Sequence, residues 1–226
     1  MTKKMMVLAL AAVTAALFAM PAAASATWKV DPSNQVFSGT SEAGTGWTWT
    51  AVGEPTITCS GQDHVSGAWT AGSEGTKGSF QLHLTNCSAS VLGFPVSCKT
   101  SGAPLSSTIL TSGTFTNVTI EGGKLGITLI PVETSIICGP STLKLHGKII
   151  GRIKEGPAAC GPSVIDSSVT VEFSGSGGVQ TPLRTDSMSV SESDDLTTTT
   201  GSSGGTATVS SKWILSMVSP TTWTCD

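Results

Sequence analysis

The clearest pattern along the chain is an alternation of apolar and basic residues between residues 142 and 153. A period of two is typical of a β-strand with one buried side and one solvent-facing side. The side expected to be buried carries Leu143, Leu145, Gly147, Ile149, Gly151 and Ile153. The other side carries Lys144, His146, Lys148, Ile150 and Arg152. We therefore expect one long strand with a basic stripe on its outer face.

A second alternating pattern surrounds the dipeptide Gly122-Gly123. Glycine accepts the positive φ angles that a two-residue hairpin turn requires at both of its positions. The pattern predicts a β-hairpin with Glu121 opposite Lys124 and Val118 opposite Ile127. In that register Val118, Ile120, Leu125 and Ile127 share one apolar face, and Asn117 and Thr119 lie on the other.

Further short alternating segments follow one another with turns rich in glycine, serine and proline. Such a chain favours an all-β fold, either a β-sandwich or an irregular β-barrel of about ten antiparallel strands. We expect residues 27–226 to form a single domain held together by disulfides. Within it, residues 174–206 are predicted to be a mobile, loop-rich segment, because glycine, serine, threonine and acidic residues dominate there.

Residues 1–26 have the features of a secretory signal peptide. Lys3 and Lys4 precede an apolar run over residues 7–20, and the small residues Ala24 and Ala26 follow it. The run is shorter than the roughly twenty apolar residues that a spanning helix needs. We expect cleavage after Ala26, with cleavage after Ala24 as the alternative. The mature chain is then secreted and lies outside the cell or at the cell envelope.

Charge and cysteine content fit this location. Without Lys3 and Lys4 the chain has ten basic and fifteen acidic side chains, which argues against nucleic-acid binding. An even number of cysteines in an exported chain predicts structural disulfides, although six cysteines allow fifteen connectivities. We favour a Cys87–Cys98 bond across a short loop, and we expect Cys225 to tether the last strand, with Cys59 as one candidate partner. The six cysteines are Cys59, Cys87, Cys98, Cys138, Cys160 and Cys225.

The sequence contains none of the common hydrolase, metalloprotease or phosphate-binding motifs. We therefore predict no catalytic residues, no cofactor and a protein that is not an enzyme. Three histidines, His64, His83 and His146, are far apart in the sequence and are expected to be solvated. We predict no metal site from them, since they could meet only through folding.

Two groups of residues are candidates for binding. Trp47 and Trp49 share a strand face on which sugar rings could stack, although filling the core is the favoured role of the tryptophans. The basic stripe of Lys144, His146, Lys148 and Arg152 could meet an anionic envelope polymer. Cations on a strand also discourage aggregation, and that structural role is the favoured interpretation.

The alanine-rich leader, the short strands rich in threonine and glycine, and the segment from Asn86-Cys87 to Cys98 resemble small secreted β-proteins of high-GC Gram-positive bacteria. This resemblance implies an extracellular or envelope location and no particular activity. We expect a non-enzymatic structural or binding protein, whose partner is an envelope polysaccharide or another envelope protein. The alternatives are a carbohydrate-binding module with an exposed tryptophan face and an envelope β-barrel pore.

Overall fold

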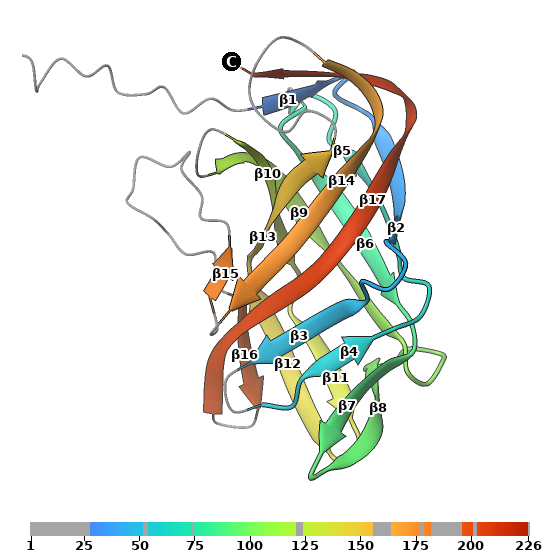
Figure 1. The fold of residues 1–226 in the computed structure, drawn as a ribbon, viewed down its shortest axis with the longest axis vertical. Coiled ribbons are helices and arrows are strands. Elements are labelled where there is room, and N and C mark those ends of the chain that lie inside the picture. Colours follow the sequence, from blue (N-terminus) through green and yellow to red (C-terminus); the bar gives the residue numbers. More distant parts are fainter. Residues whose placement is uncertain are drawn as a thin grey trace, which may run out of the picture.

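The computed structural model describes residues 28–51, 54–73, 75–120, 124–155, 164–176, 179–181, 196–200 and 203–225. The expected signal peptide and its cleavage site lie outside these residues. The described chain is all-β, as predicted, and every pair of neighbouring strands in it is antiparallel (Figure 1). It contains seventeen strands, more than the ten or so expected, because most of the long strands are broken in two.

Eight strands close into a barrel in the upper half of Figure 1, which we call the upper ring. Each strand pairs with the next, and the last pairs again with the first. A closed barrel has no free sheet edge, so this fold avoids the edge-to-edge association to which open sheets are prone. The strands, in order around the ring, are β2 (Val36–Ser41), β5 (His64–Trp69), β6 (Lys77–Leu84), β9 (Ile109–Ile120), β10 (Lys124–Pro131), β13 (Ile149–Glu155), β14 (Val164–Ser176) and β17 (Ser203–Cys225).

A second set of pairings closes below the first, and we call it the lower ring. Its strands also pair in an unbroken circle and share β17 with the upper ring. They are β3 (Trp47–Ala51), β4 (Ile57–Cys59), β7 (Cys87–Val91), β8 (Phe94–Thr100), β11 (Thr134–Cys138), β12 (Ser141–Gly147) and β16 (Leu196–Thr200). The fold is therefore a two-tier β-barrel and not a sandwich.

The chain passes from one ring to the other at breaks in its long strands. Between β2 and β3 the break lies beside Lys212 of β17, whose backbone carbonyl accepts a hydrogen bond from the Glu42 N–H at 2.8 Å. The Lys212 ammonium also donates to the Glu42 carboxylate at 3.0 Å. β17 itself runs on without a break, pairing with β3 through Ser210 and with β2 from Trp213. It is the one described strand that belongs to both rings.

The upper end of the barrel is covered by β1 (Trp28–Asp31), which pairs with the end of β17. The Trp28 indole stacks on Trp223 with ring centroids 5.1 Å apart, and its N–H donates to the backbone of β9 and β10. Asn117 lies beneath it and is 1% exposed. The Asn117 amide donates to the carbonyls of Trp28 and Gly75 and accepts from the Trp69 indole, so it joins β1 to the barrel below.

The predicted register of the hairpin was wrong. The hairpin pairs Lys124 with Ile120 and Gly126 with Val118, one residue away from the predicted register. A one-residue shift moves side chains to the opposite face of a strand. Asn117 therefore points into the barrel with Leu125 and Ile127, while Val118 and Ile120 form a separate buried cluster with Ile150.

The expected long strand over residues 142–153 is also interrupted. Gly147 ends β12 with φ of 112°, and Lys148 separates it from β13. The predicted inward face is kept across this break, since Leu143, Leu145, Ile149 and Ile153 all belong to the barrel core. Ile150 is buried on the opposite face, in the cluster with Val118 and Ile120. The segment 174–206, expected to be loop-rich, contributes the end of β14, the short β15 (Val179–Thr181), β16 and the start of β17. Residues 182–195 of that segment lie outside the described residues.

Candidate functional site

The interior of the barrel is filled with apolar side chains. Eight strands enclose a space that side chains can fill completely or that can hold a small ligand. Here two neighbouring internal cavities have volumes of only about 20 and 30 Å³, and both are lined by Trp47, Phe80 and Leu82. These cavities are the size of one or two water molecules. The interior as described therefore has no room for an organic ligand.

All six tryptophans belong to this core or to its upper end. Their exposed fractions lie between 1% and 6%, so none of them presents a ring face to solvent. Trp47 contacts Trp49, Phe173 and Trp213 with ring centroids 5.5 to 5.8 Å apart. The favoured prediction that tryptophans fill the core is confirmed. A sugar platform on Trp47 and Trp49 would require both side chains to leave the barrel.

The basic stripe lies on the outer surface of β12 and β13. Lys144 is exposed and forms an ion pair with Glu133 at 3.1 Å, and the neighbouring Lys154 forms one with Glu172 at 2.9 Å. Arg152 is half-buried, and the break at Lys148 separates it from His146. Acidic neighbours thus balance part of the positive charge of the stripe, and its role in binding stays a prediction.

A groove of about 1090 Å³ lies on the outer surface, where the strands pass from one ring to the other. Its walls come from β2, β5, β6, the end of β8, β9, β11 and β17. Polar uncharged side chains dominate the wall, and three partly exposed aliphatic side chains, Leu110, Val132 and Ile214, lie among them. Glu133 is the one carboxylate among the described lining residues. The polar lining includes Ser38, Thr40, Ser66, Gln81, Ser112 and Ser135, besides two histidines.

The two histidines in the groove are His64 and His83. They are direct partners in the β5–β6 ladder, and both are exposed. Sequence reasoning missed this pair, because nineteen residues separate the two positions and only the register of the strands brings them together. The available signal was that both occupy outward positions of alternating segments. The third histidine, His146, lies elsewhere, on β12 opposite Thr197.

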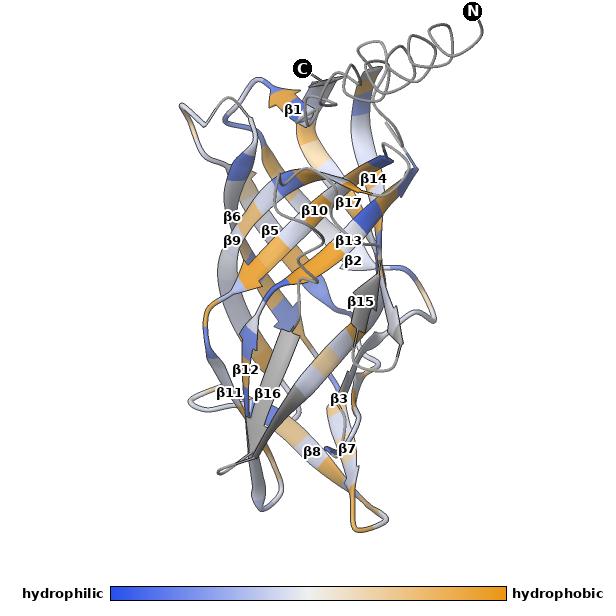
Figure 2. Ribbon diagram, turned by 90° about the vertical axis from the view of Figure 1, so that its left-hand side faces the viewer, coloured by the Kyte–Doolittle hydropathy of each residue, from blue (hydrophilic) through white to orange (hydrophobic). Residues whose placement is uncertain are grey.

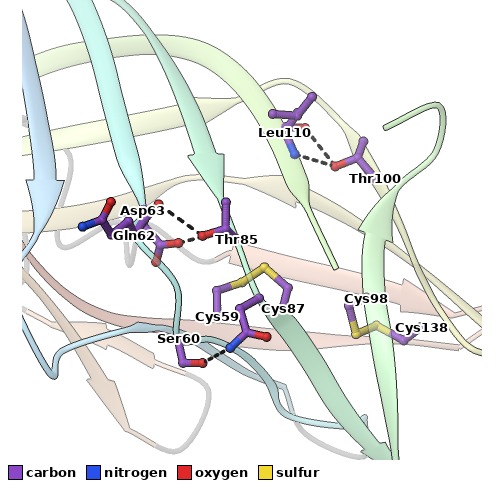
Figure 3. The surroundings of a disulfide bond; sticks show 11 residues. Cys59, Ser60, Gln62, Asp63, Thr85, Cys87, Cys98, Thr100, Leu110 and Cys138 are labelled. Carbon is purple, nitrogen blue, oxygen red and sulfur yellow. Dashed lines mark hydrogen bonds between the residues drawn. A yellow bond between two sulfur atoms is a disulfide. The ribbon is translucent and has the colours of Figure 1, made fainter. Parts of the chain in front are cut away.

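Asp63, which precedes His64 in the chain, lies against Thr85 at the end of β6 (Figure 3). It is fully buried, and its Oδ1 accepts a hydrogen bond from the Thr85 N–H at 2.8 Å. Its other oxygen, Oδ2, is buried and has no hydrogen-bond partner. Burial raises the pKa of the Asp63 carboxyl, and hydrogen bonds from the backbone of Thr85 and Trp47 oppose that shift. The charges of His64 and His83 also lower this pKa.

The disulfides lie just below this position and differ from the predicted pair. Cys59 is bonded to Cys87, and Cys98 is bonded to Cys138 (Figure 3). Each bond joins direct partners of neighbouring strands, β4 with β7 and β8 with β11. The preferred Cys87–Cys98 bond and the suggested link from Cys59 to Cys225 were therefore wrong. Cys160 and the side chain of Cys225 lie outside the described residues.

The tip of the β7–β8 hairpin is a second distinctive surface. Leu92 is 93% exposed and Phe94 is 71% exposed, at the lower end of the barrel (Figure 2). Leu92 has φ of 53° and Gly93 φ of 83°, which are the positive values of a type I′ turn. A leucine rarely adopts this conformation, so the turn holds an apolar side chain where asparagine is the usual choice.

Within the described part of the chain, no three histidine, cysteine or acidic side chains come together as a metal-binding group. No helix in these residues has the length and apolar composition to span a membrane. Comparisons with known protein families, with curated proteins and with solved structures find no match to this chain.

Proposed function

We propose that the protein is a secreted or envelope-associated binding protein without catalytic activity, and that its groove binds a segment of a neutral polysaccharide. The observation that carries this proposal is the lining of the groove. Hydroxyl, amide and imidazole groups offer hydrogen bonds in both directions, as a polymer rich in hydroxyl groups requires. The exposed parts of Leu110, Val132 and Ile214 offer apolar contact to the C–H faces of sugar rings.

The charge of the groove favours a neutral ligand over an anionic one. Glu133 is paired with Lys144, and neither lysine nor arginine is among the described lining residues. An anionic polymer would therefore find no lysine or arginine in the wall to pair with, which disfavours its association. The groove also supports a binding role over hydrolysis, because most glycoside hydrolases use two carboxyl groups on either side of the bond that is cleaved.

The proposed location rests on the leader sequence and agrees with the disulfides. Residues 1–26 have the basic start, apolar run and small-residue site of a signal peptide. The two cross-strand disulfides are consistent with an oxidising, extracellular environment. The interior does not favour an envelope pore, because packed apolar side chains occupy the place of a water-filled lumen.

Titration with neutral and anionic polysaccharides, followed by NMR of the backbone amides, tests the proposal. We expect neutral polymers to shift the signals of the groove strands β5, β6 and β9. Indole fluorescence is a poor readout, since the tryptophans are buried. Ser66→Arg should weaken binding by placing a large side chain in the groove. Ser88→Arg is the matched control, because Ser88 is exposed on β7 outside the lining residues.

The opposite pattern of results would contradict the proposal. Binding of anionic polymers alone, lost on charge reversal of Lys144 and Lys148, would assign the role to the basic stripe instead. Equal loss of binding in Ser66→Arg and Ser88→Arg, or no binding of any neutral polymer, would show that the groove is not the polysaccharide site.

A further inference from the structure

His64 and His83 are arranged as a pair by the backbone of the upper ring. They are opposite residues in the register of β5 and β6. Opposite residues of an antiparallel pair point to the same face, with Cβ atoms about 4.5–5.5 Å apart. Both side chains are exposed and line the groove, so an ion in solvent can reach them.

This spacing suits two imidazoles that bind one metal ion. A zinc ion lies about 2.0–2.1 Å from each ligating nitrogen, which places two such nitrogens roughly 3–3.5 Å apart. Two imidazoles whose Cβ atoms are about 4.5–5.5 Å apart can bring their nitrogens to this separation by rotation of the side chains. Imidazole is a favoured ligand of zinc, copper and nickel ions, whereas magnesium and calcium prefer oxygen.

Strands β5 and β6 are fixed relative to one another on the side of the histidine pair that faces the lower ring. Asp63 precedes His64, and its Oδ1 accepts the Thr85 N–H two residues beyond His83 at 2.8 Å. The Gly61 N–H donates to the Thr85 carbonyl at 3.1 Å, and the Cys59–Cys87 disulfide closes the same two chain segments. The positions of both histidines are therefore set before an ion arrives, which lowers the entropy lost on binding.

We infer that His64 and His83 form a binding site for a divalent transition-metal ion of the zinc class. The protein supplies two imidazole nitrogens, and the remaining coordination positions open into the groove, where water or another ligand completes the shell. Sequence reasoning predicted no metal site, because the pairing of β5 with β6 was not visible in it. The inference rests on the histidine pair alone and does not depend on polysaccharide binding.

Zinc titration of the protein without any histidine tag tests this site. We expect one zinc ion per chain by isothermal titration calorimetry. His64→Gln and His83→Gln should each weaken binding about tenfold or more, because a second ligand on the same scaffold raises the effective concentration of the site. His146→Gln is the matched control and should leave the zinc affinity unchanged, since His146 lies on β12.

A second measurement on the unmodified protein keeps the test independent of variant folding. In proton NMR the imidazole signals of His64 and His83 should shift together on adding zinc, and those of His146 should not. Zinc binding that survives in both His64→Gln and His83→Gln would overturn the inference. Unshifted imidazole signals of His64 and His83 at millimolar zinc would also overturn it, whatever the outcome of the polysaccharide titrations.

Discussion

Cys87 and Cys98 follow directly on the last pair of the β7–β8 ladder, Ser88 with Ser97, yet each is bonded to a cysteine on a different strand. The ladder ends before it reaches them, and the Cys87 N–H donates to the Ser107 carbonyl at 2.8 Å. Cys87 is bonded to Cys59 of β4, and Cys98 is bonded to Cys138 of β11. The four cysteines thus lie on a row of four neighbouring strands of the lower ring.

This row predicts that the middle pair will bond when the outer partners are removed. In the double variant Cys59→Ala/Cys138→Ala we expect a Cys87–Cys98 disulfide, identified by peptide mapping without reduction. The variant should also be less stable. By the chain-entropy estimate, bonds that span 28 and 40 residues contribute on the order of 3–4 kcal/mol each, and a shorter loop contributes less.

The control for this experiment is Cys98→Ala/Cys138→Ala, which should retain the Cys59–Cys87 bond. Two free thiols in Cys59→Ala/Cys138→Ala, measured under the same oxidising conditions, would contradict the predicted exchange of partners.

The disulfides and the hairpin show where sequence reasoning reached its limit. Alternation correctly indicated an all-β chain, and the cysteine count correctly indicated disulfides. Both Cys87–Cys98 and the observed bonds agree with that pattern, because all four side chains face the core and alternation does not say which of them meet. The hairpin likewise fits either register by alternation, and only the pairing of Val118 with Gly126 decides between them. Strand pairing over long distances also placed His83 beside His64, and no local pattern contains that information.

The apolar hairpin tip gives a stability prediction. Leu92→Asn should raise the free energy of unfolding by about 0.5–1 kcal/mol, because asparagine adopts a positive φ more readily than leucine. The loss of packing should be small, since the side chain is 93% exposed. Urea denaturation checks the prediction, with Leu92→Ala as a control that removes the side chain but keeps the unfavourable backbone. A lower midpoint for Leu92→Asn than for Leu92→Ala would contradict it.

Asn117 should be among the most sensitive polar positions of the barrel. Asn117→Leu keeps a similar volume but leaves the Trp69 indole without its acceptor, and it deprives the carbonyls of Trp28 and Gly75 of a donor. Buried groups that lose their partners cost about 1–3 kcal/mol each, so we expect a total loss of about 3–5 kcal/mol. Urea denaturation measures the loss, and faster hydrogen exchange of the Trp28 indole would locate it at β1.

Gln35→Leu provides a comparison for Asn117→Leu. Gln35 is 4% exposed and donates to Ser219, with its shortest contact at 2.7 Å. Because fewer buried groups lose a partner there, the loss of stability should be smaller than in Asn117→Leu. An equal or larger effect of Gln35→Leu would show that the Asn117 contacts are not the main polar restraint at the upper end.

The buried carboxyl of Asp63 predicts a pH-dependent contribution to stability. Burial raises its pKa in the folded chain above the ordinary value of 3.8. Between 3.8 and the raised pKa, the folded chain holds a proton that the unfolded chain has released. The contribution of Asp63 to stability therefore falls as the pH rises through this window, and it is least favourable above the folded pKa.

Asp63→Asn removes this titration and keeps an oxygen that can accept the Thr85 N–H. We expect the free energy of unfolding of the variant, relative to the unmodified protein, to increase as the pH rises through the window and then to level off. Urea denaturation of both proteins at a series of pH values gives the difference in their free energies of unfolding. The contributions of the other carboxylates to the pH dependence largely cancel in this difference. His64 and His83 carry charges that lower the Asp63 pKa, so His64→Gln/His83→Gln should raise the upper limit of the window and leave its lower limit in place. Parallel pH profiles for Asp63→Asn and the unmodified protein would show that burial does not raise the Asp63 pKa.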